Sequence, residues 1–303
     1  MCMFIYNPTA GRGKASKHLA LIIGRLEQIF GSVTIKETLQ EGDAARFASQ
    51  ACGVYEYLIF SGGDGTFNEV INGIAESENR PILGYIPQGT TNDIASNFGL
   101  SKKVKKALDT IQLKKTTHAD IIKVTHADSQ VSSYAAYVVA GGSLVSISYA
   151  TPQKRKRRWG RLAYFFDSLK FARQPAPAML ECIEPPHPNL SLLLILKSRH
   201  IAGFRINKDY APGDGNIQVI AIKRRGKNRV IRYIRLVCTL LRMRVRFKKG
   251  DFERKDVCRF SAKSVIVDSQ TNWAMDGEEG LSGRLEITVL DKHIRLIDST
   301  HKN

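Results

Sequence analysis

The chain has 303 residues, of which 43% are hydrophobic, and this length is sufficient for two domains with cores of their own. No apolar run approaches the length of a membrane span, and the five cysteines are scattered without metal-binding spacing, which argues against a membrane-spanning helix and a disulfide scaffold. The formal charge of +18 is uneven, with 14 lysines and arginines against 12 acidic residues in residues 1–125 and 32 against 16 in residues 126–303.

The chain opens directly on strand-like residues 3–6, with no basic region and cleavage site before them. We therefore expect no signal peptide. The odd number of scattered cysteines fits reduced, mostly buried thiols in a cytosolic protein.

The first half alternates between strands and helices. Strands are expected at residues 3–7, 33–37, 57–60 and 82–86, and helices at residues 15–30, 43–52, from the turn after residue 60 to about 76, at 92–98 and at 104–111. This alternation predicts a mainly parallel sheet with helices on both faces. Ligands bind such sheets at the carboxyl ends of the strands, where the Gly-rich turns of this chain lie.

Beyond about residue 125 the pattern changes to strands with few helices. We expect strands at residues 134–140, 178–183, 190–196, 217–222, 257–267 and 285–290, and helical inserts near 159–172 and 229–246. The pattern predicts an antiparallel sandwich or barrel-like domain over residues 126–291. A last strand at 294–297 would return to the first domain, which would then comprise residues 1–125 and 292–303.

The central motif is the turn Ser61-Gly62-Gly63-Asp64-Gly65-Thr66-Phe67-Asn68-Glu69, between a buried strand and an amphipathic helix. Such a turn presents backbone N–H groups and the positive end of a helix dipole, which suit a phosphate. Because Asp64 would repel a phosphate unless a cation lies between them, the turn indicates Mg²⁺-nucleotide chemistry. A plain tight loop is the alternative.

Two further turns lie at strand ends on the same sheet edge. Residues 7–14 follow the first strand but lack the spacing of a Walker A loop. Residues 87–93 follow the fourth strand; there Thr91 or Asn92 can cap the next helix, and Asp93 would bring a carboxylate near Asp64.

The second half contains two acidic turns. Residues 209–216, Asp-Tyr-Ala-Pro-Gly-Asp-Gly-Asn, form either a simple hairpin turn or an oxygen-rich site for a hard cation. Residues 274–280, Ala-Met-Asp-Gly-Glu-Glu-Gly, form either a charged hairpin or the source of a general base.

Taken together, these motifs resemble the soluble bacterial diacylglycerol kinase-like lipid kinases, whose relatives include sphingosine and ceramide kinases. The resemblance rests on Asn7-Pro8-Thr9-Ala10-Gly11, the Gly62–Glu69 turn, residues 86–93, and Met275-Asp276-Gly277-Glu278, with support from residues 38–44. It implies an α/β nucleotide-binding domain and a β-sandwich domain with the active site in the cleft between them. It also implies an ATP- and Mg²⁺-dependent transfer of phosphate to a lipid hydroxyl, with diacylglycerol as the first candidate and phosphatidylglycerol or another hydroxyl lipid next.

The resemblance also assigns roles to residues. It implies ATP contacts at Asn7, Pro8, Thr9, Ala10, Gly11, Thr38, Gly63, Asp64, Gly65, Thr66, Phe67, Asn68, Glu69 and Thr90. Asp64 and Asp93 would organise water and the catalytic Mg²⁺, and Glu278 would accept the proton of the lipid hydroxyl. A structural Mg²⁺ would lie at Ala211, Asp214 and Asn216.

This chain departs from the family pattern in places. Thr91 replaces a small residue and Ile94 replaces a phenylalanine. An Asn-Gly-Arg-like stretch is replaced by Lys197-Ser198-Arg199-His200, which puts the structural metal site and the acceptor pocket in question.

The basic surface suggests how the chain meets its substrate. The densest basic run is residues 154–161, which includes Trp159, and arginines at positions 232, 235, 242, 244 and 246 stud the second helical insert. The alternative is a solvated charged loop followed by a helix that packs against the core, and we favour this alternative for the apolar face of that helix. For the charges we favour peripheral docking on the anionic inner face of the membrane by a cytoplasmic protein. A homodimer would be reasonable for the family.

Three other functions are considered. NAD kinase shares the Gly-Gly-Asp-Gly-Thr loop, but residues 89–93 and 276–278 look like the lipid-kinase branch. A nucleic-acid binder is suggested by the pI of 9.8, but no nucleic-acid module is visible. A catalytically dead lipid-binding regulator ranks low because all the expected carboxylates are present.

Overall fold

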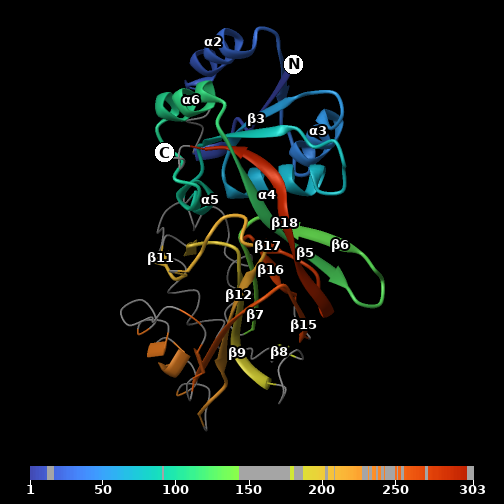
Figure 1. Cartoon of the computed structure of the whole chain (residues 1–303), viewed down its shortest axis with the longest axis vertical. Coiled ribbons are helices and arrows are strands. Elements are labelled where there is room, and N and C mark those ends of the chain that lie inside the picture. Colours follow the sequence, from blue (N-terminus) through green and yellow to red (C-terminus); the bar gives the residue numbers. More distant parts are fainter. Residues whose placement is uncertain are drawn as a thin grey trace. The chain divides into compact units, whose positions relative to one another are not determined.

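The computed structural model (Figure 1) describes residues 1–11, 17–90, 92–142, 178–180, 187–201, 204–207, 209–226, 231, 234–236, 238–239, 242, 250, 252–253, 256–269 and 272–298. The chain divides into two compact units. Unit 1 comprises Met1–Ile121, Pro212–Asp214 and Asp291–Asn303, and unit 2 comprises Ile122–Ala211 and Gly215–Leu290.

Unit 1 is built on parallel strands. Their order across the sheet is β2 (Val33–Glu37), β1 (Cys2–Tyr6), β3 (Tyr57–Gly62), β4 (Ile82–Pro87) and the end of β18 (Gly283–Ile297). The strand order reverses beside β1, and ligands of open α/β sheets bind at such a switch point, outside the carboxyl ends of the strands. The turns after β1, β3 and β4 all lie at these ends.

Helices cover both faces of this sheet. On one face, α2 (Leu19–Phe30) and α6 (Val104–Leu113) pack against Phe4 of β1 and Ile59 of β3. Successive side chains of a strand point to opposite faces, so Phe60 lies on the other face, where it contacts Phe67 of α4 (Asp64–Ile74). Helix α3 (Asp43–Ala51) packs beside α4 (Figure 1). The predicted mainly parallel sheet with helices on both faces is confirmed.

Unit 2 is antiparallel. Strand β9 (His187–Leu196) pairs on one edge with β12 (Ile217–Lys223), which continues to β14 (Val257–Ala262) and β13 (Phe252–Glu253). On its other edge β9 pairs with β8 (Ala178–Leu180) near its start and with β7 (Val138–Gly142) near its end. Strand β8 continues to β15 (Ser264–Ser269) and β18, and β7 to β16 (Ala274–Met275) and β17 (Glu278–Glu279). Among the described residues, an apolar core with Trp273 fully buried in it joins β7, β9, β12, β14, β15, β16 and β18.

Several predicted elements differ from the structure. The strand predicted at residues 134–140 is two strands, β6 (Ser132–Ala135) and β7. The strand predicted at 257–267 is also two, β14 and β15, which separate at Lys263. Conversely, the strands predicted at 285–290 and 294–297 are parts of the single long strand β18.

The sequence analysis missed one long strand, β5 (Thr116–His126), which pairs with β6 and β18. In unit 1, its Asp120 carboxylate accepts the backbone N–H of Lys292 at 2.7 Å. Lys292 has a φ of 48°, so β18 is irregular at the residue that separates its two predicted halves.

The helical inserts are only partly described. The predicted helix at 159–172 and the basic run 154–161 lie outside the described residues. In the second insert the described residues are helical, and we call them the basic segment: Ile231, Ile234–Leu236, Cys238, Thr239 and Arg242. Leu236 is buried, as predicted for the apolar face, but Ile231 and Ile234 are 41% and 53% exposed. The core-packed interpretation is therefore wrong for these two isoleucines.

Candidate active site

The central turn passes from β3 into α4 through closely packed glycines. A Cβ atom on Gly62 would collide with the side chain of Thr66. A Cβ atom on Gly63 would lie 3.3 Å from the Cα atom of Gly89, in the turn after β4. The N-cap residue of α4 is Gly63, and no side-chain hydrogen bond caps this end of the helix.

The turn after β4 is held against the central turn. A Cβ atom on Gly89 would lie 2.6 Å from the Cα atom of Gly63. The side chain of Asn92, in the left-handed conformation, accepts the N–H of Gly89 at 2.8 Å and donates to its carbonyl at 2.9 Å. Thr90 is exposed within this turn, and Thr91 lies outside the described residues.

Asp64 joins these two turns directly. Its carboxylate accepts the backbone N–H of Asp93 at 3.1 Å and that of Ile94 at 3.2 Å. These amides open the short helix α5 (Asp93–Asn97), so Asp64 caps a helix that follows it by 29 residues. The predicted capping by Asn92 is wrong, because its side chain bonds Gly89 instead. The backbone of Asp93 thus lies within hydrogen-bonding distance of Asp64, and the predicted approach of the two carboxylates stays a prediction.

The turn after β1 is the third part of this edge. The Asn7 amide donates to the Thr66 hydroxyl at 3.4 Å, and its backbone N–H donates to the carbonyl of Ser61 at 3.0 Å. Its side-chain oxygen accepts the N–H and the hydroxyl of Thr9. Pro8 and Ala10 complete the turn, and Gly11 follows with a φ of 59°.

An aromatic cluster lies beneath the turns. The ring centroids of Phe60, Phe67 and Tyr85 are 5.1 to 5.3 Å apart. The Tyr85 hydroxyl donates to the carbonyl of Gly62 at 3.2 Å, and burial, followed by the charge of Asp64, raises its pKa well above the usual value. Because the ring of Phe67 is fully buried, any contact of this residue with ATP would be made by its backbone.

The remaining predicted ATP contacts are near the same edge. Thr38 is buried, and its backbone N–H donates to the carbonyl of Tyr6 at 3.0 Å. The Glu69 carboxylate accepts the N–H groups of Gly42 and Ala44, both at 3.1 Å, at the start of α3. Burial raises the pKa of Glu69. Gly65 and Asn68 lie in the first turns of α4.

In unit 2, residues 274–280 form the hairpin of β16 and β17, with Glu278 exposed on β17. The carboxylate of Asp276, at the tip of the hairpin, is buried and accepts three backbone N–H groups, from Ala136 at 2.6 Å and from Tyr137 and Val138 at 3.0 Å. Sequence reasoning assigned Asp276 no role, because its partners lie about 140 residues away in the chain.

The other acidic turn of the second half, residues 209–216, is contacted by a lysine side chain that the sequence analysis did not anticipate there. Ala211, Asp214 and Asn216 are exposed in this turn, which leads into β12. The side chain of Lys197 is buried, and its Nζ donates to the carbonyl oxygen of Asn216 at 3.0 Å and to that of Ala211 at 3.5 Å.

Comparisons with known proteins agree with these motifs. Residues 1–124 match the diacylglycerol kinase catalytic domain. The chain is 30% identical over 300 residues to a diacylglycerol kinase of Bacillus subtilis (strain 168), covering 97% of this chain and 94% of the relative. The chain belongs to the diacylglycerol kinase family of lipid kinases.

Other members of the family support this assignment. A diacylglycerol kinase of Staphylococcus haemolyticus (strain JCSC1435) is 31% identical over 302 residues, covering 96% of this chain and 86% of the relative. The crystal structure of a diacylglycerol kinase from Bacillus anthracis str. Sterne superposes with a TM-score of 0.76 at 22% identity, covering 99% of this chain and 97% of that one, which shows the shared fold.

Two features are absent from the described residues. No cluster of three or more His, Cys, Asp or Glu side chains there could hold a metal ion. The described residues also contain no helix that is long and hydrophobic enough to cross a membrane.

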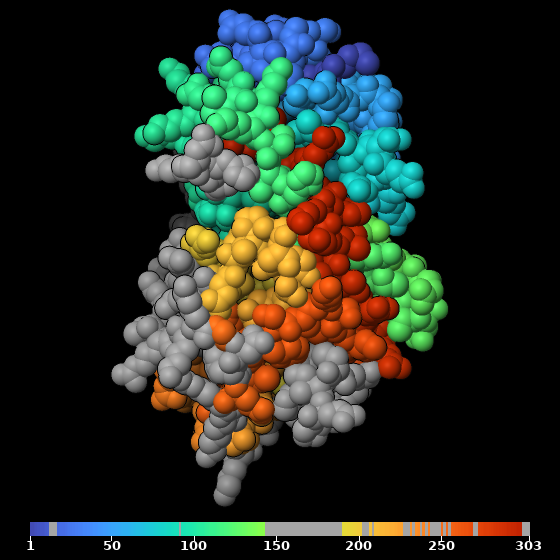
Figure 2. Space-filling model, viewed as in Figure 1, coloured from blue at the N-terminus to red at the C-terminus, as the bar shows by residue number. Residues whose placement is uncertain are grey.

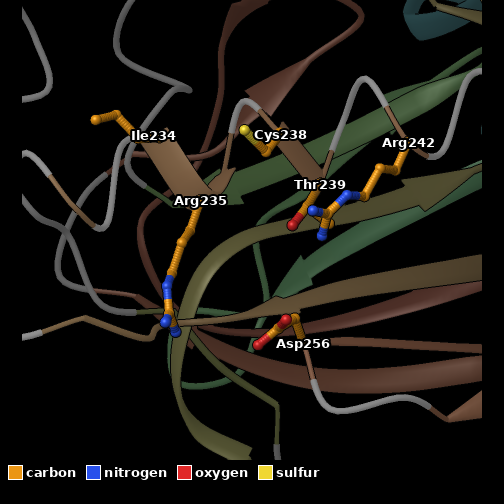
Figure 3. Close-up of a pocket in the computed structure, with 6 residues that line it drawn as sticks. All are labelled: Ile234, Arg235, Cys238, Thr239, Arg242 and Asp256. Carbon is orange, nitrogen blue, oxygen red and sulfur yellow. The ribbon is translucent and has the colours of Figure 1, made fainter.

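A cavity of about 280 Å³ lies in unit 2, apart from the residues that we predicted to carry the chemistry. It is lined by Ile234, Arg235, Cys238, Thr239, Arg242 and Asp256. Figure 3 shows the first five coming from the basic segment, with Asp256 facing them from the start of β14. Asp256 also forms an ion pair with Arg225 at 3.4 Å.

Proposed function

We propose that this lipid kinase transfers the γ-phosphate of ATP to the hydroxyl of diacylglycerol, giving phosphatidic acid. The observation that carries the proposal is the linkage of three turns at the carboxyl ends of β1, β3 and β4. Asn7 bonds Thr66, Gly63 abuts Gly89, and Asp64 bonds the amides that begin α5. The relatives named diacylglycerol kinase make the lipid reaction more plausible than the NAD kinase alternative.

The ATP phosphates would bind at the start of α4. A helix N-terminus carries a partial positive charge and N–H groups without intrahelical partners, and no side chain caps this one. The absence of a side chain at Gly65 lets a phosphate approach the backbone of this first turn. The predicted contacts of Asn7, Thr38 and Thr90 with the nucleotide are part of this proposal.

Asp64 and Asp93 are the residues that would hold the catalytic Mg²⁺. Mg²⁺ is commonly bound by one or two carboxylates together with substrate phosphates and water, and these two carboxylates belong to linked turns. The backbone amides of Asp93 and Ile94 fix the orientation of the Asp64 carboxylate. When bound, Mg²⁺ neutralises the negative charge of the phosphates.

Glu278 is proposed as the acceptor of the hydroxyl proton. A carboxylate needs access to its substrate, and Glu278 is exposed on a hairpin whose tip is anchored by Asp276. The proton acceptor would thus sit on a short and well-held element rather than on a loose loop.

The basic segment is proposed to meet an anionic membrane surface. Its exposed isoleucines, Ile231 and Ile234, lie among arginines, and a helix of this kind lies in a lipid interface with the charges at the head groups. Docking of this kind would bring the protein to a substrate that resides in the bilayer.

The test is an acceptor panel. Purified protein would receive γ-labelled ATP and Mg²⁺ with micelles of diacylglycerol or phosphatidylglycerol, with NAD, or with no acceptor. We expect the label in phosphatidic acid. Label in another lipid would replace the acceptor only, whereas label in NADP, or in no product at all, would refute the proposed function.

A further inference from the structure

Lys197 of unit 2 contacts Ala211 and Asn216, two residues of the same unit at which the family resemblance implies a structural metal. The residue follows β9, and its backbone N–H donates to the carbonyl of Tyr137 at 2.9 Å, which fixes where its side chain begins. The residue is only 3% exposed. Its side chain therefore reaches the turn through the interior of the unit, and not over its surface.

The ammonium group meets the same atoms that would bind the metal. Lys197 Nζ lies 3.0 Å from the carbonyl oxygen of Asn216 and 3.5 Å from that of Ala211. These are two of the three residues implied as ligands, and carbonyl oxygens are typical ligands of hard cations. A main-chain carbonyl offers the same lone pairs to an ammonium donor and to a metal ion.

A second cation would not fit beside the first. A Mg²⁺ ion binds its oxygen ligands at about 2.1 Å, so an ion on these carbonyls would lie within a few ångströms of the ammonium. Like charges at such a separation repel, and the buried Lys197 side chain cannot swing out into water to relieve the repulsion. The residues present therefore do not fit a structural Mg²⁺.

We propose that the Lys197 ammonium replaces the structural metal ion in this chain and binds the carbonyl groups of the turn before β12 in its place. The replacement lies in residues 197–200, where the sequence departs from the Asn-Gly-Arg-like pattern of the family. Figure 2 shows the segment that contains the turn and β12 (gold) at the surface, and Ala211, Asp214 and Asn216 are exposed. Added ions therefore have access to the turn in an experiment.

The experiment measures thermal unfolding of the nucleotide-free full chain in EDTA, in millimolar Mg²⁺ and in millimolar Ca²⁺. Wild type is expected to unfold at the same temperature in all three. Lys197→Asn restores the amide of the family pattern and removes the ammonium, so it should unfold at a lower temperature in EDTA and recover part of the loss in Mg²⁺ or Ca²⁺. Lys263→Asn, at an exposed lysine between β14 and β15, is the matched control and should gain no response to either ion.

Two results would overturn the proposal. One is a folded Lys197→Asn protein whose unfolding temperature is the same in EDTA, in Mg²⁺ and in Ca²⁺. The other is a wild-type protein that Mg²⁺ stabilises and whose stabilisation disappears in Asp214→Asn, since that pair of results would assign a metal to this turn. The wild-type comparison decides the matter even if Lys197→Asn does not fold.

Discussion

At the scale of single residues, the site depends on the absence of side chains as much as on carboxylates. Gly63 and Gly89 touch backbone to backbone, so neither turn can accept a Cβ atom without moving the other. The Asp64 carboxylate also links the two turns, because it accepts hydrogen bonds from two backbone N–H groups at the start of α5. The motif residues therefore act as one unit, and single changes at them should have coupled effects.

Gly89→Ala should disturb this contact. The new Cβ atom would lie 2.6 Å from the Cα atom of Gly63, which cannot rotate away as a side chain could. We expect a loss of about 1–3 kcal/mol in the free energy of unfolding and a weaker affinity for ATP, measured by denaturant titration and by calorimetry. The matched control is Gly24→Ala in α2, which meets nothing within 4 Å and should instead stabilise the protein by about 0.5–1 kcal/mol. Equal effects at the two positions would show that the close approach does not matter.

Glu278→Gln should separate chemistry from binding. The amide cannot accept the proton of a lipid hydroxyl, so kcat should fall about 100-fold or more while the KM for ATP stays the same. The neighbouring Glu279 is also exposed on β17 and accepts a hydrogen bond from Asn272. Glu279→Gln should therefore retain its turnover, and near-normal turnover in Glu278→Gln would remove Glu278 as the proton acceptor.

At the scale of elements, regular strands and turns were predictable and long-range contacts were not. β2 was predicted with its observed bounds, and the three turns were placed at the carboxyl ends of their strands, because local apolar runs and glycines determine these features. β5 was missed because its first half is polar and its pairing with β18 joins residues far apart in the chain. The capping of α5 by Asp64 was likewise missed, since local spacing suggested Thr91 or Asn92.

Asp276 explains why the strand predicted at 134–140 is divided. Its carboxylate accepts three successive amides at the junction of β6 and β7, and these amides would otherwise be buried without this acceptor. Asp276→Ala should lower the free energy of unfolding by about 3 kcal/mol or more, as judged by denaturant titration. Asp276→Asn retains one acceptor oxygen, so its free energy of unfolding should lie between those of wild type and Asp276→Ala. Asp128→Ala, at an exposed residue between β5 and β6, should be about as stable as wild type. A tolerated Asp276→Ala would mean that the division of the strand has another cause.

At the scale of the whole molecule, the positive charge is divided unevenly along the chain. Residues 126–303 hold 32 lysines and arginines against 16 acidic residues, whereas the three linked turns lie in the nearly neutral first 125 residues. The fold class followed from the sequence because it depends on patterns that run over many residues. The detailed contacts of unit 2 did not, because a buried lysine and a buried aspartate look in sequence like ordinary surface residues.

This uneven charge predicts how the protein binds lipid. Co-sedimentation with vesicles should increase with the fraction of anionic lipid and decrease with salt, because each basic residue near such a surface contributes about 1 kcal/mol. Arg235→Gln combined with Arg242→Gln should weaken binding to anionic vesicles, whereas Arg25→Gln, at an arginine of unit 1 paired with Asp109, should not. Binding that is insensitive to anionic lipid would count against membrane docking by the basic segment.

We propose that the linked turns around Asp64 perform Mg²⁺-dependent phosphoryl transfer to a lipid. The most direct measurement follows label from γ-labelled ATP into diacylglycerol with wild type and Asp64→Asn side by side, each with and without Mg²⁺. The asparagine can still accept a hydrogen bond from the start of α5 but has no charge to offer a cation. We predict labelled phosphatidic acid from wild type with Mg²⁺ alone, and none from a folded Asp64→Asn. Equal labelling by the two proteins would contradict the account.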